Sequence, residues 1–324
     1  MRRFALFLVG PFFAAAAHAD VAAVVRDHAL PGYARLTAAT AQLADAAEMS
    51  CTNEALAPAF HTAFDAWMGV QHLHLGPVEE EGRGLAIAFW PDPKMLGLKA
   101  QRALLAGDPA RLEPEEFAEQ SVAARGLMGL ERLLWPTEPW EGETCPLIRA
   151  TARDLARLAR EVEAGWRQGY ADQILTAGQP DNELFLSGAE ARQAIFTVIV
   201  TGLEEIRDKR IGRPLGTFDR PAPERAEARA SGRSLRNVTL ELAALRQMVV
   251  ALTEDAPKTV TALDAALETA EGLGDPVFAG VATPSGRLKV EILQQAVDRA
   301  REAALQELGP ALGVALGFNA ADGD

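Results

Sequence analysis

The stretch Ala124–Trp135 (ARGLMGLERLLW) sets a carboxylate beside a thioether in an otherwise helical sequence. Met128 and Glu131 are three residues apart and therefore share one face of a helix. A carboxylate is a hard metal ligand and a thioether is a soft one, so this pair alone makes a poor site for any common metal ion. Burial of Met128 with Glu131 at the edge of the helix is a sufficient packing explanation, and a metal-site frame that lacks one ligand is the alternative.

The histidines form a second candidate set, and all five lie at or before residue 74. This placement excludes an H-E-x-x-H zinc protease. His61, Asp65 and His72 fall on nearly one stripe of a predicted helix. His61 and His72 are nevertheless about 16 Å apart along the helix axis, so they cannot share one metal ion without other ligands. His74 falls on the predicted core face just before the helix ends, which favours a hydrogen-bonded core histidine but also allows a cleft position.

The segment Arg83–Asp92 (RGLAIAFWPD) is aromatic and extended in character. One interpretation is a loop that joins two helices through the side chains of Phe89 and Trp90. The functional interpretation places Arg83 and Asp92 at the rim of a pocket. The sequence by itself favours the structural loop.

Residues 1–19 have the pattern of a secretory signal peptide. Two arginines precede an apolar run over residues 4–17, and the small residues Ala17–Ala19 predict cleavage after Ala19. The run is too short for a membrane span, and no other stretch reaches about 18 unbroken apolar residues. We therefore expect a periplasmic mature chain that begins near Asp20 and has no membrane span.

The mature chain is strongly acidic. Removal of residues 1–19 leaves 30 basic and 45 acidic side chains, a formal charge of −15. This balance argues against a protein that follows nucleic-acid phosphates or docks on anionic lipid. It is compatible with attraction of cations and with plain solubility.

Cys51 and Cys145 are the two cysteines of the chain. In an exported protein an even pair indicates one disulfide, which here would close a long loop. A zinc site would need more sulfur or histidine ligands at short spacing. We therefore predict a Cys51–Cys145 bond that steadies the first part of the fold.

Apolar residues recur with a helical period through nearly the whole chain, whereas the alternating pattern of strands is almost absent. Glycine and proline breakers fall between the periodic stretches. Eight or nine helices joined by short polar loops are typical of helix bundles. We predict an all-α fold with a signal peptide over 1–19, a bundle over 20–180 that carries the motif helix, and a bundle over 181–324. The expected helices are Val21–Ala47, Ala55–Leu75, Lys94–Ala106, Pro114–Trp135, 145–175, Ala189–Lys209, Leu235–Leu252, Val260–Leu273 and Leu288–Leu308.

Several segments together resemble the imelysin family. The family signature is a helical G-x-H-x-x-E frame, and Gly126, Met128 and Glu131 occupy it here with methionine in place of histidine. AFDAWMGVQHLHLGP followed by IAFWPD is similar to the family's run of Trp, Gly-Pro and Phe-Trp-Pro-Asp. LEEIRDKRIGRPLG and RASGRSLRN resemble segments of its second domain, and LGVALGFNAADGD resembles its C-terminus. The matches occur in order over most of the mature chain.

The resemblance implies an envelope protein made of two four-helix-type bundles with a cleft between them. Members are classified as metallopeptidases from the His/Glu motif, and several belong to iron-regulated or iron-uptake systems. Met128 removes the ligand on which the peptidase classification depends, and hydrolysis would need further ligands and a bound water. Glu131 remains available as a ligand in a rebuilt site. The residues that we expect at the cleft or at a metal ion are Glu131, His72, His74, Arg83, Trp90 and Asp92.

We therefore expect an exported, non-catalytic imelysin-like protein that binds a metal ion or a small ligand in the cleft between the bundles. Iron is the metal that the family context implies, and metal-uptake components of the envelope are the expected partners. Two alternatives stay open. One is an imelysin-type metallopeptidase, whose chelator-sensitive cleavage would be lost in Glu131→Gln. The other is a helical scaffold or partner-binding protein.

Overall fold

The computed structural model describes residues 19–315, and over that range the chain is helical with a single isolated bridge between Thr217 and Arg220. The all-α prediction is confirmed. Residues 1–18 of the predicted signal peptide and the terminal segment Leu316–Asp324 lie outside the described residues. None of the helices in the described range combines the length and apolar character that a membrane-spanning helix requires.

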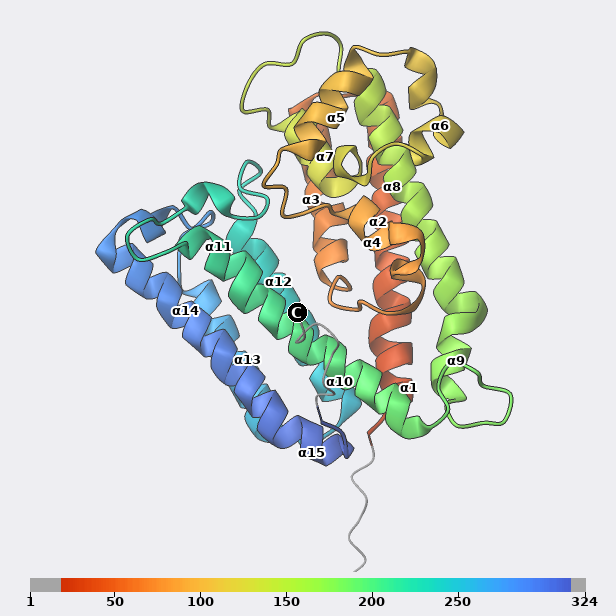
Figure 1. Cartoon of the computed structure of the whole chain (residues 1–324), viewed down its shortest axis with the longest axis vertical. Coiled ribbons are helices and arrows are strands. Elements are labelled where there is room, and N and C mark those ends of the chain that lie inside the picture. The colour runs from red at the N-terminus through yellow and green to blue at the C-terminus, as the bar shows by residue number, and fades with distance from the viewer. Residues whose placement is uncertain (1–18, 316–324) are drawn as a thin grey trace, which may run out of the picture.

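The first group of helices is built on three long helices that lie side by side (Figure 1). A short turn joins α2 (Leu30–Met49) to α3 (Asn53–Met68), and α8 (Cys145–Gly165) packs along α2. The short motif helix α7 (Gly126–Leu134) contacts both α3 and α8, so these four helices close a ring. The shorter helices of this group are α1 (Val21–Ala23), α4 (Arg83–Ile87), α5 (Leu96–Leu105), α6 (Pro114–Ala118) and α9 (Ala171–Leu175).

The second group of helices is a ring of four long helices, drawn from green to blue in Figure 1. Helices α10 (Gly188–Glu204) and α13 (Pro257–Glu271) each contact both α12 (Ser234–Leu252) and α14 (Pro284–Ala303). Ser187 caps α10 by accepting a hydrogen bond from the Glu190 amide at 3.2 Å, which fits the capping box in the sequence. The short helices α11 (Gly212–Leu215) and α15 (Gly309–Leu312) complete the group.

Several long helices contain π-helical turns. These turns are Val24–Ala29, Trp166–Tyr170, Glu205–Ile211 and Ala304–Leu308, and six 3-10 turns lie at Gly76–Val78, Glu80–Gly82, Pro109–Leu112, Val122–Ala124, Pro223–Arg225 and Ala279–Ala282. The turn Glu205–Ile211 carries α10 without a break into α11. Because a π-helical turn widens the helix and re-aims its side chains, such turns are frequent at functional sites.

One connected apolar core extends through both groups. Polar contacts add to it, since Arg233 at the start of α12 is buried and its Nη2 lies 2.5 Å from Oδ1 of Asp65 on α3. Arg233 Nη1 also lies 3.0 Å from His61 Nδ1. Two members of the predicted stripe on α3 therefore bind an arginine of the other group. The domain boundary near residue 180 stays a prediction.

Two predicted helices are shorter than expected. The prediction of one helix over Ala55–Leu75 is wrong at its C-terminal end, because α3 ends at Met68 and the chain turns at Gly69. Trp67 O accepts hydrogen bonds from the amides of Val70 and Gln71 in this turn. His72 and His74 therefore lie beyond α3. His72 does not share the stripe of His61 and Asp65, and His74 does not lie on the core face of this helix.

The prediction of one helix over Pro114–Trp135 is also wrong. The chain instead forms α6, a short 3-10 turn and α7, and Gly126 has φ +65° at the start of α7. A left-handed residue cannot continue a right-handed helix, so the break falls at the first residue of the motif. A third difference concerns Arg83–Asp92, whose first five residues form the short helix α4 where the sequence suggested an extended segment.

The Cys51–Cys145 disulfide is confirmed, with the two Cα atoms 5.4 Å apart. Cys51 precedes α3 and Cys145 is the first residue of α8. The bond therefore ties the turn after α2 to the helix that follows the motif helix.

Candidate functional site

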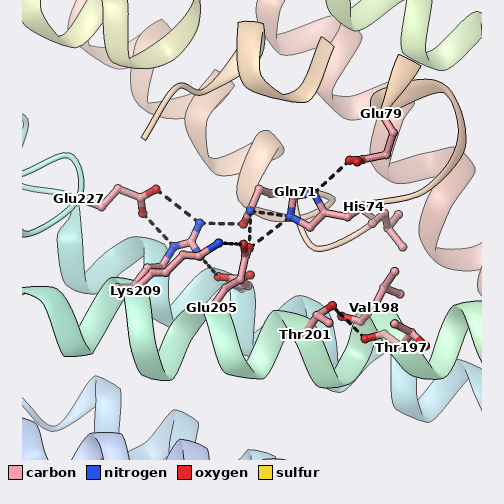
Figure 2. Close-up of polar contacts among 12 residues, drawn as sticks. Gln71, His74, Glu79, Thr197, Val198, Thr201, Glu205, Lys209 and Glu227 are labelled. Atoms are coloured by element: carbon pink, nitrogen blue, oxygen red, sulfur yellow. Dashed lines mark hydrogen bonds and ion pairs between the residues drawn. The ribbon is translucent and has the colours of Figure 1, made fainter. Parts of the chain in front are cut away.

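A cavity of about 340 Å³ lies where the turn after α3 meets the π-helical segment Glu205–Ile211. The turn contributes Gln71, His74 and Glu79 from the first group, and the second group contributes Glu205 and its neighbours (Figure 2). Because α3 ends at Met68, His74 lies in the turn that follows the helix, and its side chain lines this cavity. The residues that line the cavity are Trp67, Gln71, His74, Val78, Glu79, Gly82, Gly84, Leu85, Ala88, Trp90, Glu205, Lys209, Arg210 and Glu227.

The imidazole of His74 lies between two carboxylates. Its Nδ1 is 3.2 Å from Glu79 Oε1, and its Nε2 is 3.2 Å from Glu205 Oε2. Burial by itself lowers the pKa of His74, but the hydrogen bonds and charges of Glu205 and Glu79 outweigh it and raise the pKa above 6.5. The ring is therefore a charged link between the two groups of helices at slightly acidic pH.

Glu205 is the centre of this polar cluster. Its Oε2 accepts a hydrogen bond from Gln71 Nε2 at 3.1 Å, and its Oε1 lies 2.5 Å from Lys209 Nζ (Figure 2). Burial raises the pKa of Glu205, but His74 and Lys209 stabilise its charged form and hold the pKa far below the ordinary value. Glu205 is thus a fixed carboxylate whose acceptor positions are largely used by the protein.

A buried arginine supports the cluster from behind. Arg210 is 4% exposed, donates to Gln71 Oε1 at 2.7 Å and to Glu227 Oε2 at 2.9 Å, and forms an ion pair with Glu241 Oε2 at 2.7 Å. Glu241 is fully buried and neither of its oxygens accepts a well-aligned hydrogen bond from a described residue. Burial raises the pKa of Glu241 to about 8, although Arg210 acts in the opposite direction.

A second, smaller pocket of about 220 Å³ lies beside the motif helix α7. Glu131 lines it and is 5% exposed. Glu131 Oε1 accepts hydrogen bonds from the amide and the hydroxyl of Ser231 at 2.8 and 2.7 Å, so the motif carboxylate also joins the two groups. Burial raises the pKa of Glu131 and the Glu227 charge adds to this effect, while Ser231 and Arg132 oppose it.

The other two motif positions have structural roles. A Cβ atom at Gly126 would overlap the carbonyl oxygens of Ala86 and Ile87, so only glycine fits where α7 starts. Met128 is 7% exposed and belongs to the apolar core. Its thioether packs as a hydrophobic side chain, as the packing interpretation expected, whereas Glu131 is buried and does not lie at an exposed edge of the helix.

The structure brings the predicted site residues together in two pairs. His74 and Trp90 line the 340 Å³ cavity, and Glu131 and Asp92 line the 220 Å³ pocket. Asp92 uses its two oxygens to accept hydrogen bonds from the amides of Leu96 and Gly97, both at 2.8 Å, at the start of α5.

His72 and Arg83 line neither pocket. His72 is fully buried, and its Nε2 lies 2.9 Å from Nε2 of the buried His28. Burial lowers the pKa of His72 well below 6.5, so the ring is neutral. Arg83 forms ion pairs with three acidic side chains near the surface. They belong to Glu80, Glu81 and Glu161.

The donor set does not fit a preassembled metal site. Over residues 19–315 no group of three or more His, Cys, Asp or Glu side chains could hold one metal ion. Glu79 and Glu205 bind opposite nitrogens of His74, so the two carboxylates cannot converge with the ring on a single ion. Glu131 and Asp92 already hold backbone amides.

Sequence reasoning missed several residues of the site, namely Glu205, Lys209, Arg210, Glu227 and Ser231. Three of them lie 100 or more positions from a partner in the first group: Ser231 from Glu131, Glu205 from His74 and Arg210 from Gln71. Lys209 and Glu227 bind Glu205 and Arg210 within the second group. One local signal was readable, because Glu205 and Lys209 are four residues apart in a helical stretch. The segments LEEIRDKRIGRPLG and RASGRSLRN, which contain four of the five, were a second signal.

Comparison with known proteins agrees with this architecture. The chain is 26% identical over 301 residues to iron-regulated protein A of Synechococcus elongatus, which covers 83% of this chain and 79% of that protein. The crystal structure of an imelysin-like protein from Psychrobacter arcticum matches with a TM-score of 0.77 at 19% identity, over 92% of this chain and 96% of that one. A putative iron-regulated protein A precursor from Parabacteroides distasonis matches with a TM-score of 0.61 at 14% identity, over 88% of this chain and 92% of that one.

The imelysin family model matches residues 29–304, which include the long helices of both groups and all residues that line the two pockets. This chain therefore belongs to the imelysin family.

Proposed function

We propose that the mature chain is an exported, non-catalytic imelysin-family protein that binds a small polar ligand between its two groups of helices. The observation that carries the proposal is the cavity of about 340 Å³, in which His74 of the first group meets Glu205 of the second. Ligand pockets of about this size are commonly built between packed elements, with apolar walls and a few placed polar groups. Trp67, Trp90 and Leu85 supply such walls here.

The charges at the cavity favour a ligand that carries both donors and acceptors. Glu205 is neutralised by Lys209 and His74, and Glu227 by Arg210. Because the charged groups are mutually paired, a bare anion or a bare cation would have to displace an ion pair to enter. A polar or zwitterionic molecule could instead exchange hydrogen bonds at little cost.

Of the two kinds of ligand expected from the sequence, the donor set supports the small molecule over a directly bound metal ion. An iron-acquisition context is supported by the relatives that are named iron-regulated protein A. Residues 1–19 support export to the periplasm. The absence of peptidase activity is proposed because Met128 stands at the family's histidine position and Glu131 Oε1 is occupied by Ser231.

Native mass spectrometry and calorimetric titration of the mature chain test the proposal. The probes are the small-molecule fraction of a periplasmic extract and, separately, Fe³⁺, Cu²⁺ and Zn²⁺. We expect a bound small molecule whose affinity falls at least tenfold in Glu205→Gln. Glu224→Gln is the matched control, because the side chain of Glu224 is 69% exposed and lies outside the cavity. The Glu224→Gln variant should bind the small molecule with the same affinity as the parent.

Three results would contradict the proposal. Tight binding of a bare metal ion that is lost in Glu205→Gln would show that the cavity binds a metal ion and not a small molecule. Chelator-sensitive cleavage of an unfolded protein that is lost in Glu131→Gln would establish the metallopeptidase alternative. No bound molecule from the extract, together with a protein partner crosslinked in intact cells, would establish the scaffold alternative.

A further inference from the structure

The pocket beside α7 has the composition of a binding site of its own. It lies between α5, α7 and the loop that follows α7, and Ala230 of the second group closes one side. Two tryptophans, Trp135 and Trp140, face it together with other apolar side chains. Its full lining is Asp92, Met95, Leu98, Arg102, Glu131, Arg132, Trp135, Pro136, Thr137, Glu138, Pro139, Trp140 and Ala230.

Glu131 is the one acidic side chain of this pocket that is both buried and incompletely partnered. Its Oε1 accepts two hydrogen bonds from Ser231, whereas its Oε2 accepts none from a described residue. Glu131 also forms no ion pair within residues 19–315. A buried carboxylate without a paired cation is costly, because the two hydrogen bonds from Ser231 replace only part of the stabilisation that water gives the charge.

The neighbouring charged groups are committed elsewhere. Arg132 Nε donates to Gln101 Oε1 at 3.1 Å, and its Nη2 donates to the Ala123 carbonyl. Arg102 and Glu138 pair with each other at 3.1 Å on the exposed rim. Neither arginine forms an ion pair with Glu131 among the described residues, although the charge of Arg132 favours its ionised form. A ligand cation would meet an Oε2 atom that accepts no hydrogen bond from a described residue.

We propose that this pocket binds a primary ammonium carried on an apolar, preferably aromatic, group. The ammonium donates to Glu131 Oε2, and the apolar group packs against Trp135 and Trp140. A charged hydrogen bond in a desolvated site and contact with aromatic faces are the interactions that recognise organic ammonium ions. An ammonium fits better than a guanidinium, because a bidentate guanidinium would need both oxygens of Glu131 and Ser231 holds one of them.

This inference does not depend on the ligand of the 340 Å³ cavity. The proposed site also differs from a metal site. Both oxygens of Asp92 accept hydrogen bonds from amides at the start of α5, and Met128 is buried in the core. The position that holds a metal-binding motif in the family therefore presents here one carboxylate oxygen and an aromatic wall. That chemistry selects an organic cation.

Calorimetric titration with phenethylamine tests the proposal, with 2-phenylethanol as the uncharged probe of the same shape. We expect phenethylamine to bind the mature chain at least tenfold more tightly than 2-phenylethanol. Glu131→Gln keeps the size of the side chain and an acceptor for Ser231 but removes the charge. This variant should bind phenethylamine at least tenfold more weakly than the parent does, and its affinity for 2-phenylethanol should be unchanged.

Two control variants locate the effect. Glu224→Gln removes an exposed carboxylate that lines neither pocket, and Glu205→Gln removes one from the other cavity. Both should bind phenethylamine as the parent does, and circular dichroism should show that all three variants are folded. Equal affinity for amine and alcohol would overturn the proposal, as would unchanged amine binding in Glu131→Gln. Loss of binding in Glu205→Gln alone would place the amine in the other cavity and would also overturn it.

Discussion

His74 Nε2 lies 3.2 Å from Glu205 Oε2, although the two residues are 131 positions apart and belong to different groups of helices. The other nitrogen of the ring faces Glu79. With a carboxylate at each nitrogen, both N–H groups of an imidazolium have an acceptor, whereas a neutral ring could donate to only one of the two carboxylates. The contact thus couples the charge of one histidine to the joint between the two groups.

The first prediction concerns the titration of His74. Its pKa is raised by Glu205 and Glu79 in spite of burial, so His74 should titrate above 6.5 in a nuclear magnetic resonance experiment. The charged form then stabilises the fold fully below pH 6.5, and this contribution is lost as the pH rises through the raised pKa. Glu205→Gln should move the His74 pKa down.

His61 is the internal reference for this measurement. Burial, and then the charge of Arg233, lower the pKa of His61, and none of the groups that shift it is Glu205. Its titration should therefore be the same in the parent and in Glu205→Gln. A His74 pKa that does not respond to Glu205→Gln would contradict the assigned contact.

The second prediction concerns Gly126. Its left-handed conformation costs about 1–2 kcal/mol for any residue with a Cβ atom. Overlap of that atom with the carbonyl oxygens of Ala86 and Ile87 should add about 1–3 kcal/mol. Gly126→Ala should therefore lower the free energy of unfolding by about 2–5 kcal/mol in urea denaturation.

Gly142→Ala is the matched control, because Gly142 also has a positive φ of +91° but nothing lies within 4 Å of a Cβ atom there. Its destabilisation should be limited to about 1–2 kcal/mol. Equal losses in the two variants would mean that α4 does not press on the start of α7.

The third prediction concerns the Cys51–Cys145 bond, which closes a loop of 94 residues. Removal of a native disulfide commonly costs about 2–5 kcal/mol, chiefly because the unfolded chain gains freedom. Reduction of the parent should lower the free energy of unfolding by that amount. The double variant Cys51→Ser, Cys145→Ser should match the reduced parent and be insensitive to reductant, and a parent that is equally stable with and without reductant would contradict the prediction.

Much of the fold was predictable from the sequence because helical periodicity is a local property. The ring α10, α12, α13 and α14 corresponds to four predicted stripes, and the cysteine pair was predicted from compartment and number. The ends of two helices were not predictable in the same way. The apolar pattern continues past Met68 and across Gly126, while the chain turns at the first position and becomes left-handed at the second.

The sequence predicted site residues of the first group of helices but not those of the second group. Glu131, Asp92, His74 and Trp90 were expected at a cleft, and the structure distributes them between two pockets. Glu131 and His74 find Ser231 and Glu205 in the second group, and these contacts are fixed by packing. Spacing along the chain carries no information about which helix the turn after α3 will meet. His72 shows the same limit, since its partner His28 sits on a π-helical turn that the sequence did not predict.

The fourth prediction concerns the buried carboxyl of Glu241. Burial raises its pKa to about 8, so the folded state keeps a proton that the unfolded state releases near the ordinary value of 4.5. The folded protein should therefore lose stability progressively as the pH rises from about 4.5 to about 8. Glu241→Gln mimics the protonated form and should make the melting temperature less dependent on pH over this range.

The charged groups around Glu241 set the size of this effect. Arg210 favours the ionised carboxyl, while Glu205 and Glu227 disfavour it, and His74 adds a smaller favourable charge. Because His74 also loses its stabilising charge above pH 6.5, the informative quantity is the difference between the parent and Glu241→Gln at each pH. Glu224→Gln should leave the pH profile of the parent unchanged, since its side chain is 69% exposed. A Glu241→Gln profile that runs parallel to that of the parent would show that Arg210 keeps Glu241 ionised throughout, and that the cluster behind the cavity carries one more negative charge than proposed.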